Sequence, residues 1–210
     1  MTMRTLSFIA LLLVFGGGAW AQTPKPELAA LAVELQRGGH VIVMRHGATH
    51  ANQADLAPLQ PDGPGAQRQL NDKGREAAKA FGSALKAIGV PVGKTYTSRF
   101  NRAFETAVLA GRADAEKSID ITEGGLVVSP IENARRAAAL KKLVETPPAA
   151  GTTVFVVTHK PNILDAFGKA WFEVREGEAS IFRPQPGGTV LVARVLIEEW
   201  PAIAAAGVRR

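Results

Sequence analysis

An arginine and a histidine follow one apolar run of this sequence at a position that could support chemistry. Residues 41–44 are Val-Ile-Val-Met, which predicts a buried strand, and Gly47 predicts a sharp exit from it. Arg45 and His46 therefore lie at the carboxyl end of a strand, where open α/β sheets bind their ligands. Arginine offers a rigid fork of donors that suits phosphate, and histidine can act as a covalent nucleophile. Taken alone, the tripeptide Arg45-His46-Gly47 also fits a turn with only a structural role.

Two further strand ends carry polar side chains that should reach the same edge of the sheet. Ser98 follows a short candidate strand, and Arg102 lies one turn into the next predicted helix. His159 follows the β-branched run at 152–157. Two histidines and two arginines would form a pocket for a tetrahedral dianion, and helix amino termini there would add N–H donors. The alternatives are a histidine that only packs at a strand end and an arginine on an exposed helix face.

The elements that must position these residues alternate between strands and helices, which predicts one layered α/β domain. No internal repeat or linker divides it. The stretch 50–69 is rich in Pro, Gly and Gln without any period, which predicts a long loop. The expected helices span 27–37, 72–88, 99–110 with Ser98 as N-cap, 131–145 and a segment from Pro161, and the expected strands span 41–44, 94–97, 152–157, 180–183 and 189–197.

The amino-terminal 21 residues have the pattern of a cleaved secretory signal. Arg4 precedes an apolar run at 6–15, and Ala19-Trp20-Ala21 is an A-x-A-like cleavage site. The run is too short to span a bilayer comfortably, and no later segment qualifies, so no stable membrane insertion is expected after cleavage. We therefore expect a signal at 1–21, a lead with one helix at 22–39, the main domain at 40–197 and a mobile tail at 198–210.

Composition narrows the classes of partner. The chain has 25 basic and 19 acidic residues, a formal charge of +6, which falls by one to +5 without Arg4. This balance is compatible with acidic substrates, but the basic residues are scattered without interleaved aromatics, so no nucleic acid is expected. Cysteine is absent, which excludes disulfides, thiolate chemistry and cysteine-bound zinc. Export without disulfides favours a bacterial periplasmic or secreted protein.

Four ordered motifs resemble those of the histidine phosphatase superfamily, the phosphoglycerate-mutase-like fold. Together they cover nearly all of residues 40–197. The resemblance implies a single three-layer α/β domain with a mostly parallel sheet flanked by helices. The matching segments are Arg-His-Gly-Ala-Thr-His-Ala-Asn at 45–52, Leu-Asn-Asp-Lys-Gly-Arg-Glu-Ala at 70–77, Ser98 through Arg102 to Glu-Thr-Ala at 105–107, and Val-Thr-His at 157–159.

The resemblance also implies a role for individual residues. His46 would be the nucleophile and form a phosphohistidine that water then hydrolyses. It must attack as a neutral imidazole, so its second nitrogen should be held by a hydrogen bond. No metal and no cofactor is implied, because positive side chains take the place that Mg²⁺ fills elsewhere. Arg45, Arg102 and His159 would hold the phosphoryl oxygens, and Thr49, Asn52 and Ser98 would contribute to substrate binding.

The general acid is where this sequence departs from its relatives. One large branch of the family has Asp directly after the second histidine, but here that position is Lys160. The other branch takes its acid from a Glu downstream of the second arginine. Glu123, 21 residues beyond Arg102, is the first candidate, and Glu178 is its rival. Glu132 and Asp165 are weaker candidates.

The expected activity combines the resemblance with the export signal. It is a metal-independent, extracytoplasmic phosphomonoester hydrolase that acts through a phosphohistidine on a small phosphorylated molecule, such as a sugar phosphate of the envelope. One alternative is a noncatalytic phosphate- or polyanion-binding member of the same fold. Another is a phosphohistidine-protein phosphatase, which is hard to reconcile with export.

Overall fold

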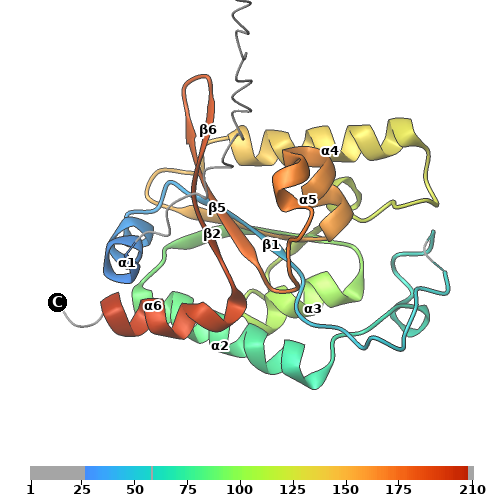
Figure 1. Cartoon of the computed structure of the whole chain (residues 1–210), viewed down its shortest axis with the longest axis horizontal. Coiled ribbons are helices and arrows are strands. Elements are labelled where there is room, and N and C mark those ends of the chain that lie inside the picture. The colour runs from blue at the N-terminus through green and yellow to red at the C-terminus, as the bar shows by residue number, and fades with distance from the viewer. Residues whose placement is uncertain (1–26, 58, 208–210) are drawn as a thin grey trace, which may run out of the picture.

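The computed structural model describes residues 27–57 and 59–207 and contains one mixed six-stranded sheet (Figure 1). The strand order is β3-β2-β4-β1-β5-β6. The first four strands in this order run parallel to one another, whereas β5 is antiparallel to both β1 and β6. The strands are β1 (Val41–Arg45), β2 (Val92–Ser98), β3 (Glu116–Ser118), β4 (Thr153–Thr158), β5 (Ala179–Gln185) and β6 (Gly188–Val195).

Helices cover both faces of the sheet, which confirms the predicted three-layer α/β architecture. In Figure 1, α4 and α5 lie on one side of the sheet and α1, α2, α3 and α6 on the other. Each face has its own apolar cluster of buried side chains. The helices are α1 (Leu28–Gln36), α2 (Asp72–Ile88), α3 (Asn101–Leu109), α4 (Pro130–Glu145), α5 (Lys160–Phe167) and α6 (Trp200–Gly207), with 3₁₀ turns at 64–66, 119–121, 169–171 and 197–199.

Helix α2 has the start and the end that its sequence predicts. The side chain of Asn71 accepts a hydrogen bond from the Gly74 amide at 2.8 Å, which satisfies one of the free donors of the first turn. Gly89 ends the helix in the left-handed conformation, with a φ of 81°. The ring of Phe81 lies 5.4 Å from that of Phe155 on β4 and 4.8 Å from that of Trp200 on α6. The apolar face of α2 thereby joins the sheet to the carboxyl-terminal helix.

Two glycines let the backbone of α2 approach other backbone segments directly. A Cβ at Gly82 would lie 2.5 Å from the carbonyl oxygen of Ala110, at the end of α3. A Cβ at Gly74 would overlap the backbone of Ala48, in the turn that follows His46. A side chain at either position would push the helix away.

Two expectations for helix boundaries are wrong. Ser98 is the last residue of β2 and α3 begins at Asn101, so Ser98 does not cap that helix. Its Oγ accepts a hydrogen bond from the Phe100 amide at 3.0 Å, which stabilises the bend between strand and helix. The expectation of a mobile tail after Trp200 is wrong for residues up to 207, because α6 packs on α1 and α2 and Ile203 is buried.

The structure does not describe the amino-terminal residues for which the sequence predicts a signal and the first part of a lead. The predicted signal at 1–21 and the lead up to residue 26 lie outside the described residues. Within the part of the chain that the structure describes, no helix is both long and apolar enough to cross a bilayer. The predicted loop at 50–69 is irregular apart from the 3₁₀ turn at 64–66 and a bridge between Thr49 and Leu70.

Candidate functional site

Three parallel strands end at one edge of the sheet and bring the predicted polar residues together. The register pairs Arg45 of β1 with Thr158 of β4, and the neighbouring strand β2 ends at Ser98. His46 and His159 follow β1 and β4 directly. Their ring centroids are 5.2 Å apart, although 113 residues separate them in the sequence. The meeting of strand ends that the sequence predicts is therefore present.

His46 is buried, and its tautomer follows from its contacts. Its Nδ1 lies 2.8 Å from the carbonyl oxygen of Gly47. A carbonyl oxygen can only accept, so Nδ1 carries the proton and Nε2 carries the lone pair. Burial lowers the pKa of His46 well below its usual value, and the nearby charge of Arg102 lowers it further. His46 is thus a neutral imidazole with a free nitrogen, the form that nucleophilic attack requires.

His159 is buried as well and is held by Ser98. Its Nε2 lies 2.7 Å from the Oγ of Ser98, whose own proton goes to Thr122 at 3.3 Å. Nε2 is therefore the donor in the contact with Ser98. The other nitrogen, Nδ1, lies 3.3 Å from Oε2 of Glu123. Burial and the charge of Arg102 lower the pKa of His159 well below its usual value.

Arg102 is fully buried between two carboxylates. One terminal guanidinium nitrogen donates to Oδ1 of Asp55 at 2.9 Å, and the other donates to Oε2 of Glu123 at 3.0 Å. Its guanidinium also lies 4.6 Å from the ring centroid of Phe100. The exposed-helix alternative for Arg102 does not hold.

Arg45 lies at the margin of the site. It donates to the carbonyl oxygen of Val174 at 2.9 Å, and its other terminal nitrogen is 3.5 Å from Glu176. Thr49 donates to the same carboxylate at 2.7 Å and is buried. Asn52 is exposed in the loop. The structure thus places Arg45 and Thr49 together, whereas Ser98 lies beneath His159 and supports that ring.

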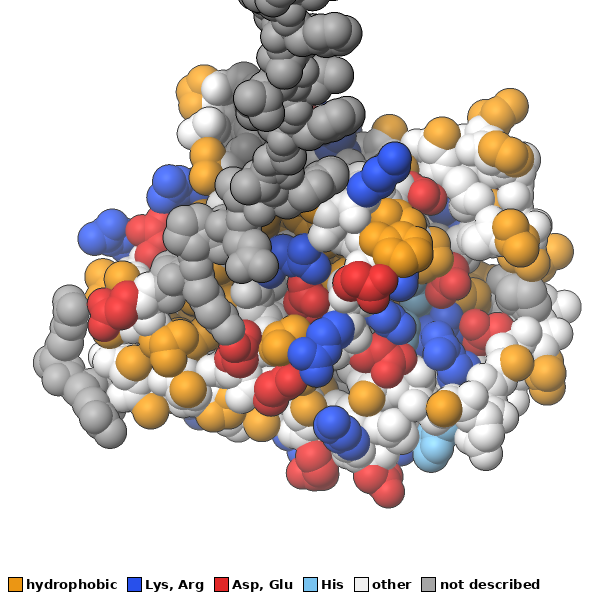
Figure 2. Space-filling view, viewed as in Figure 1, with side chains coloured by type: hydrophobic (Ala, Val, Ile, Leu, Met, Phe, Trp, Pro, Cys, Tyr) orange, Lys and Arg blue, Asp and Glu red, His pale blue; other side chains and the backbone are white. Residues whose placement is uncertain are grey.

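Arg45 and Thr49 line an open hollow of about 510 Å³ beside the buried histidines. Its wall includes cations from α2 and α5, Lys73 and Lys160, together with Glu176. Figure 2 shows basic and acidic side chains intermixed on this face, where α5 approaches the segment after β1. A polar substrate could therefore reach the site from this side.

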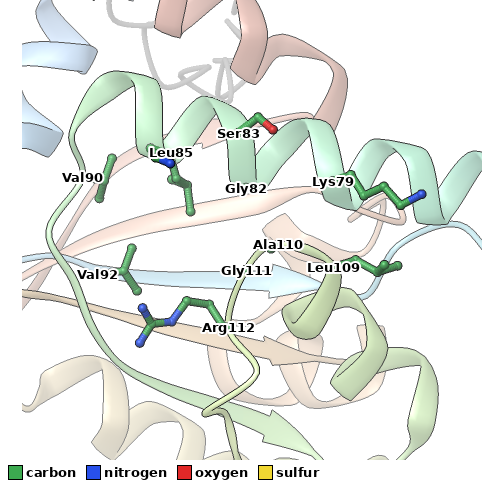
Figure 3. A pocket seen from close by; sticks show the side chains of 11 residues that line it. Lys79, Gly82, Ser83, Leu85, Val90, Val92, Leu109, Ala110, Gly111 and Arg112 are labelled. Atoms are coloured by element: carbon green, nitrogen blue, oxygen red, sulfur yellow. The ribbon is translucent and has the colours of Figure 1, made fainter.

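A second hollow lies at the opposite end of the parallel strands (Figure 3). It has a volume of about 460 Å³ and lies between α2, the end of α3 and the start of β2. Lys79 and Arg112 line it, and none of its lining residues is a histidine or an acid. The nucleophile candidate His46 and the acid candidate Glu123 lie instead beside His159, at the end of the strands.

The candidate acids differ sharply in their surroundings. Both oxygens of Glu178 are engaged, one by Arg194 at 2.6 Å and the other by the Arg175 amide at 3.0 Å. Hydrogen bonds from Arg135 and Arg136 lower the pKa of Glu132 to about 2, so this carboxyl is ionised at neutral pH.

Asp165 is exposed on α5 and lines a different hollow. Glu123 alone among the predicted acids contacts both Arg102 and His159.

Three residues of the site were missed by the sequence analysis. Asp55 contacts Arg102, and Arg68 lines the hollow and lowers the pKa of both buried histidines through its charge. Both come from the loop at 50–69, which has no period that could place its side chains. Glu176 had a usable signal, because it lies two residues before the predicted rival Glu178 in the same segment.

Across residues 27–57 and 59–207, no three His, Cys, Asp or Glu side chains gather where they could hold a metal ion. The expected metal independence stays a prediction.

Comparison with known proteins agrees with the motifs. A family model described as the histidine phosphatase superfamily, branch 1, matches residues 41–124, from β1 to just beyond Glu123. A comparison with curated proteins finds no sequence that matches the chain.

Solved structures share the fold at low sequence identity. The protein histidine phosphatase SixA, complexed with tungstate, is 19% identical with a TM-score of 0.52, and the match covers 76% of this chain and 98% of that one. A mutant phosphoserine phosphatase from Entamoeba histolytica, in complex with phosphoserine, is 16% identical with a TM-score of 0.50 and coverages of 74% and 95%. A candidate α-ribazole-5′-P phosphatase from Escherichia coli is 20% identical with a TM-score of 0.51 and coverages of 72% and 94%.

These likenesses concern the fold. The model of the histidine phosphatase superfamily matches the segment that carries Arg45, His46, Arg102 and Glu123, so this part of the chain is similar to that family.

Proposed function

We propose that this protein is a phosphomonoester hydrolase that acts through a phosphohistidine at His46. The observation that carries the proposal is the hydrogen bond from Nδ1 of His46 to the Gly47 carbonyl, which leaves the Nε2 lone pair free. This nitrogen belongs to a neutral ring in a buried site that also holds the guanidinium of Arg102. A buried nucleophile beside a fixed cation suits transfer of a dianionic phosphoryl group.

The proposed first step forms a bond from Nε2 of His46 to phosphorus and breaks the bond from phosphorus to the leaving oxygen. The guanidinium of Arg102, with Arg45 and Arg68 nearby, stabilises the charge on the transferred phosphoryl oxygens. In the second step water attacks phosphorus, the P–N bond breaks, and His46 returns to its neutral form as inorganic phosphate leaves.

The leaving oxygen needs a proton, and the pair of His159 and Glu123 can supply one. Because Nε2 of His159 donates to Ser98, its Nδ1 has a lone pair that faces Oε2 of Glu123 at 3.3 Å. In the proposed step Glu123 passes a proton to the leaving oxygen and takes one back from the attacking water. This arrangement supports Glu123 as the general acid over Glu178.

The proposed substrate is a small phosphorylated molecule, and the proposed location is outside the cytoplasm. The open hollow of about 510 Å³ has the size of a small-molecule site and is lined by charged rather than large apolar side chains. The relatives named above are described as acting on phosphoserine or as a candidate phosphatase of α-ribazole-5′-P, which are phosphomonoesters. The location rests only on the signal-like pattern at 1–21.

A chromogenic phosphomonoester tests the reaction. Activity should survive a chelator and should fall by several orders of magnitude in His46→Ala, because no other side chain replaces the nucleophile. His50→Ala is the matched control, since His50 lies in the loop outside the pair of buried rings, and it should keep its activity. Rapid quenching with labelled substrate should trap an acid-labile phosphoryl group on wild-type protein but not on His46→Ala. A fully active His46→Ala variant would refute the mechanism.

A noncatalytic oxyanion-binding protein is the second candidate, and one observation favours it. Both terminal nitrogens of Arg102 are already engaged by carboxylates, so the strongest cation of the site is not free. Such a protein would bind inorganic phosphate or tungstate without releasing phosphate from any ester. Phosphohistidine peptides, alkyl phosphates and sugar phosphates should be included in the substrate panel, because the protein histidine phosphatase SixA shares the fold.

A further inference from the structure

The cation expected to bind the phosphoryl group is already occupied in this structure. Arg102 has two terminal guanidinium nitrogens, and a phosphoryl group is best bound by both at once. One of them donates to Asp55 at 2.9 Å and the other to Glu123 at 3.0 Å. Arg102 is fully buried, and although its Nε has no hydrogen-bond partner, its two terminal nitrogens face the carboxylates of Asp55 and Glu123. A phosphoryl group that uses the fork of Arg102 must therefore displace a carboxylate.

Of the two carboxylates, Asp55 is the one that can move away from Arg102 without breaking a contact with the catalytic histidines. Glu123 also contacts His159, which makes it part of the proton path. Asp55 has no contact with either histidine. Among the described residues, its Oδ1 accepts from Arg102 and otherwise only from the Arg68 amide, at 2.9 Å. Its side chain is 19% exposed, so water already reaches it and can solvate it once it is displaced.

The segment that carries Asp55 is held in place by few contacts. The next residue, Leu56, is 81% exposed and contributes almost no apolar burial, although its amide donates to the Ala66 carbonyl at 2.8 Å. Segments with little buried apolar surface open at low free-energy cost. The side chain of Asp55 is therefore held by its hydrogen bonds with Arg102 and the Arg68 amide, and not by apolar packing of the next residue.

We propose that Asp55 is an internal competitor that occupies the phosphoryl-binding fork of Arg102 until a tetrahedral oxyanion displaces it. The proposal rests on the proposed function for the identity of the natural oxyanion, a phosphomonoester. Once Asp55 is displaced, a dianionic phosphoryl group engages the guanidinium nitrogen that Asp55 held, while Glu123 keeps the other. The apparent affinity of the site is reduced by the fraction of molecules in which Asp55 still holds Arg102. The contact thus selects for dianionic ligands over single carboxylates.

Direct binding of tungstate, a phosphate-shaped oxyanion, tests the competition without any need for turnover. Calorimetric titration should show that Asp55→Asn binds tungstate at least about tenfold more tightly than wild type, since contacts between close charges typically have this strength. Asp55→Glu keeps the charge and should bind as weakly as wild type. The matched control is Asp114→Asn, which removes an exposed carboxylate that pairs with Arg112 at 2.8 Å, far from the site. That variant should bind like wild type.

Equal or weaker tungstate binding by Asp55→Asn would overturn the proposal. Urea unfolding of each variant shows whether it is folded, and Asp55→Ser provides a second removal of the charge if the Asn variant is not. Failure of the proposed function has a different signature, in which no phosphomonoester is hydrolysed but the gap in tungstate affinity remains. If Asp55→Asn instead lost turnover only on alkyl phosphates while tungstate affinity stayed at the wild-type level, Asp55 would be an acid and the competitor role would be wrong.

Discussion

Acidification should destabilise this protein through its two buried histidines. His46 and His159 are 1% and 0% exposed, and burial together with the charge of Arg102 lowers the pKa of both rings well below 6.5. In the unfolded chain each imidazole recovers its ordinary pKa. Below pH 6.5 the unfolded state therefore binds protons that the folded state rejects, and the free energy of unfolding falls as the pH falls. The loss begins near pH 6.5 and ends only at the lowered pKa values of the folded state.

The size of the effect follows from the number of histidines involved. Inside that window each histidine contributes a slope of up to about 1.4 kcal/mol per pH unit, so the two together contribute up to about 2.7 kcal/mol per pH unit. Against a typical total stability of about 5–15 kcal/mol this loss is large. Replacing either ring by Asn, which is polar and does not titrate, should remove about half of the slope.

Urea unfolding at a series of pH values measures this slope. The wild type, His46→Asn and His159→Asn should have similar pH dependence above about pH 7, where the rings of His46 and His159 are neutral in both states. Their curves should diverge below it, with the wild type losing stability fastest. The comparison uses the slope of the free energy of unfolding against pH. Any loss of that free energy that a substitution causes at neutral pH therefore does not affect the result. Parallel curves through the acidic range would show that the rings are not held neutral by the fold, and the argument for a neutral nucleophile would fail with them.

Three further predictions follow from the same structure. Glu123→Gln should lose about 100-fold or more on an alkyl phosphate and much less on a nitrophenyl phosphate, whereas Glu178→Gln should show no such split in kinetic assays, because its oxygens are engaged elsewhere. Trp200→Ala should lower the free energy of unfolding by about 3–5 kcal/mol in urea titrations, because this fully buried ring packs on Phe81. Intact-mass measurement of protein from a periplasmic fraction should place the mature amino terminus at or close to Gln22, and a full-length cytoplasmic product would contradict export.

The sequence predicts the framework of the site because the signals for it are local. Four apolar residues before Arg45 and the β-branched run before His159 each identify a buried strand and the residue that follows it. The sequence offers Asn71 or Asp72 as the cap of α2 and Gly89 as its end, and in the structure Asn71 is the cap and Gly89 ends the helix. Since parallel strands end at one edge, these local signals suffice to bring His46 and His159 together.

The remainder of the site depends on contacts that no local pattern encodes. Asp55 and Arg68 lie in a loop without periodicity, and only the fold shows that one carboxylate turns toward Arg102. Only the fold shows which way the side chains of Glu176 and Glu178 point. Neighbours two apart share a face in a regular strand, but these residues precede β5, and one pairs with Thr49 while the other pairs with Arg194.

The mobile tail expected at the carboxyl terminus is a different kind of error, because the sequence of this segment contains the signal for a helix. Residues 200–207 are Trp-Pro-Ala-Ile-Ala-Ala-Ala-Gly, a run of strong helix formers with a proline in the first turn. Trp200, Ile203 and Ala204 recur at helical spacing and are the buried residues of α6. The expectation of a mobile tail gave too much weight to the position of the segment in the chain.

At two places α2 contacts other segments through backbone atoms. The position of the turn after the nucleophile His46 therefore depends little on how the core side chains pack. Gly74 rests on the turn after His46 and Gly82 rests on the end of α3, so main chain meets main chain at both places. Side-chain volume does not set the distance at such contacts. Conservative exchanges among the apolar residues beneath α2 should therefore alter the melting temperature more than the turnover number. Laboratory evolution of a more heat-resistant form can start from that layer of the core, provided that both glycines are retained.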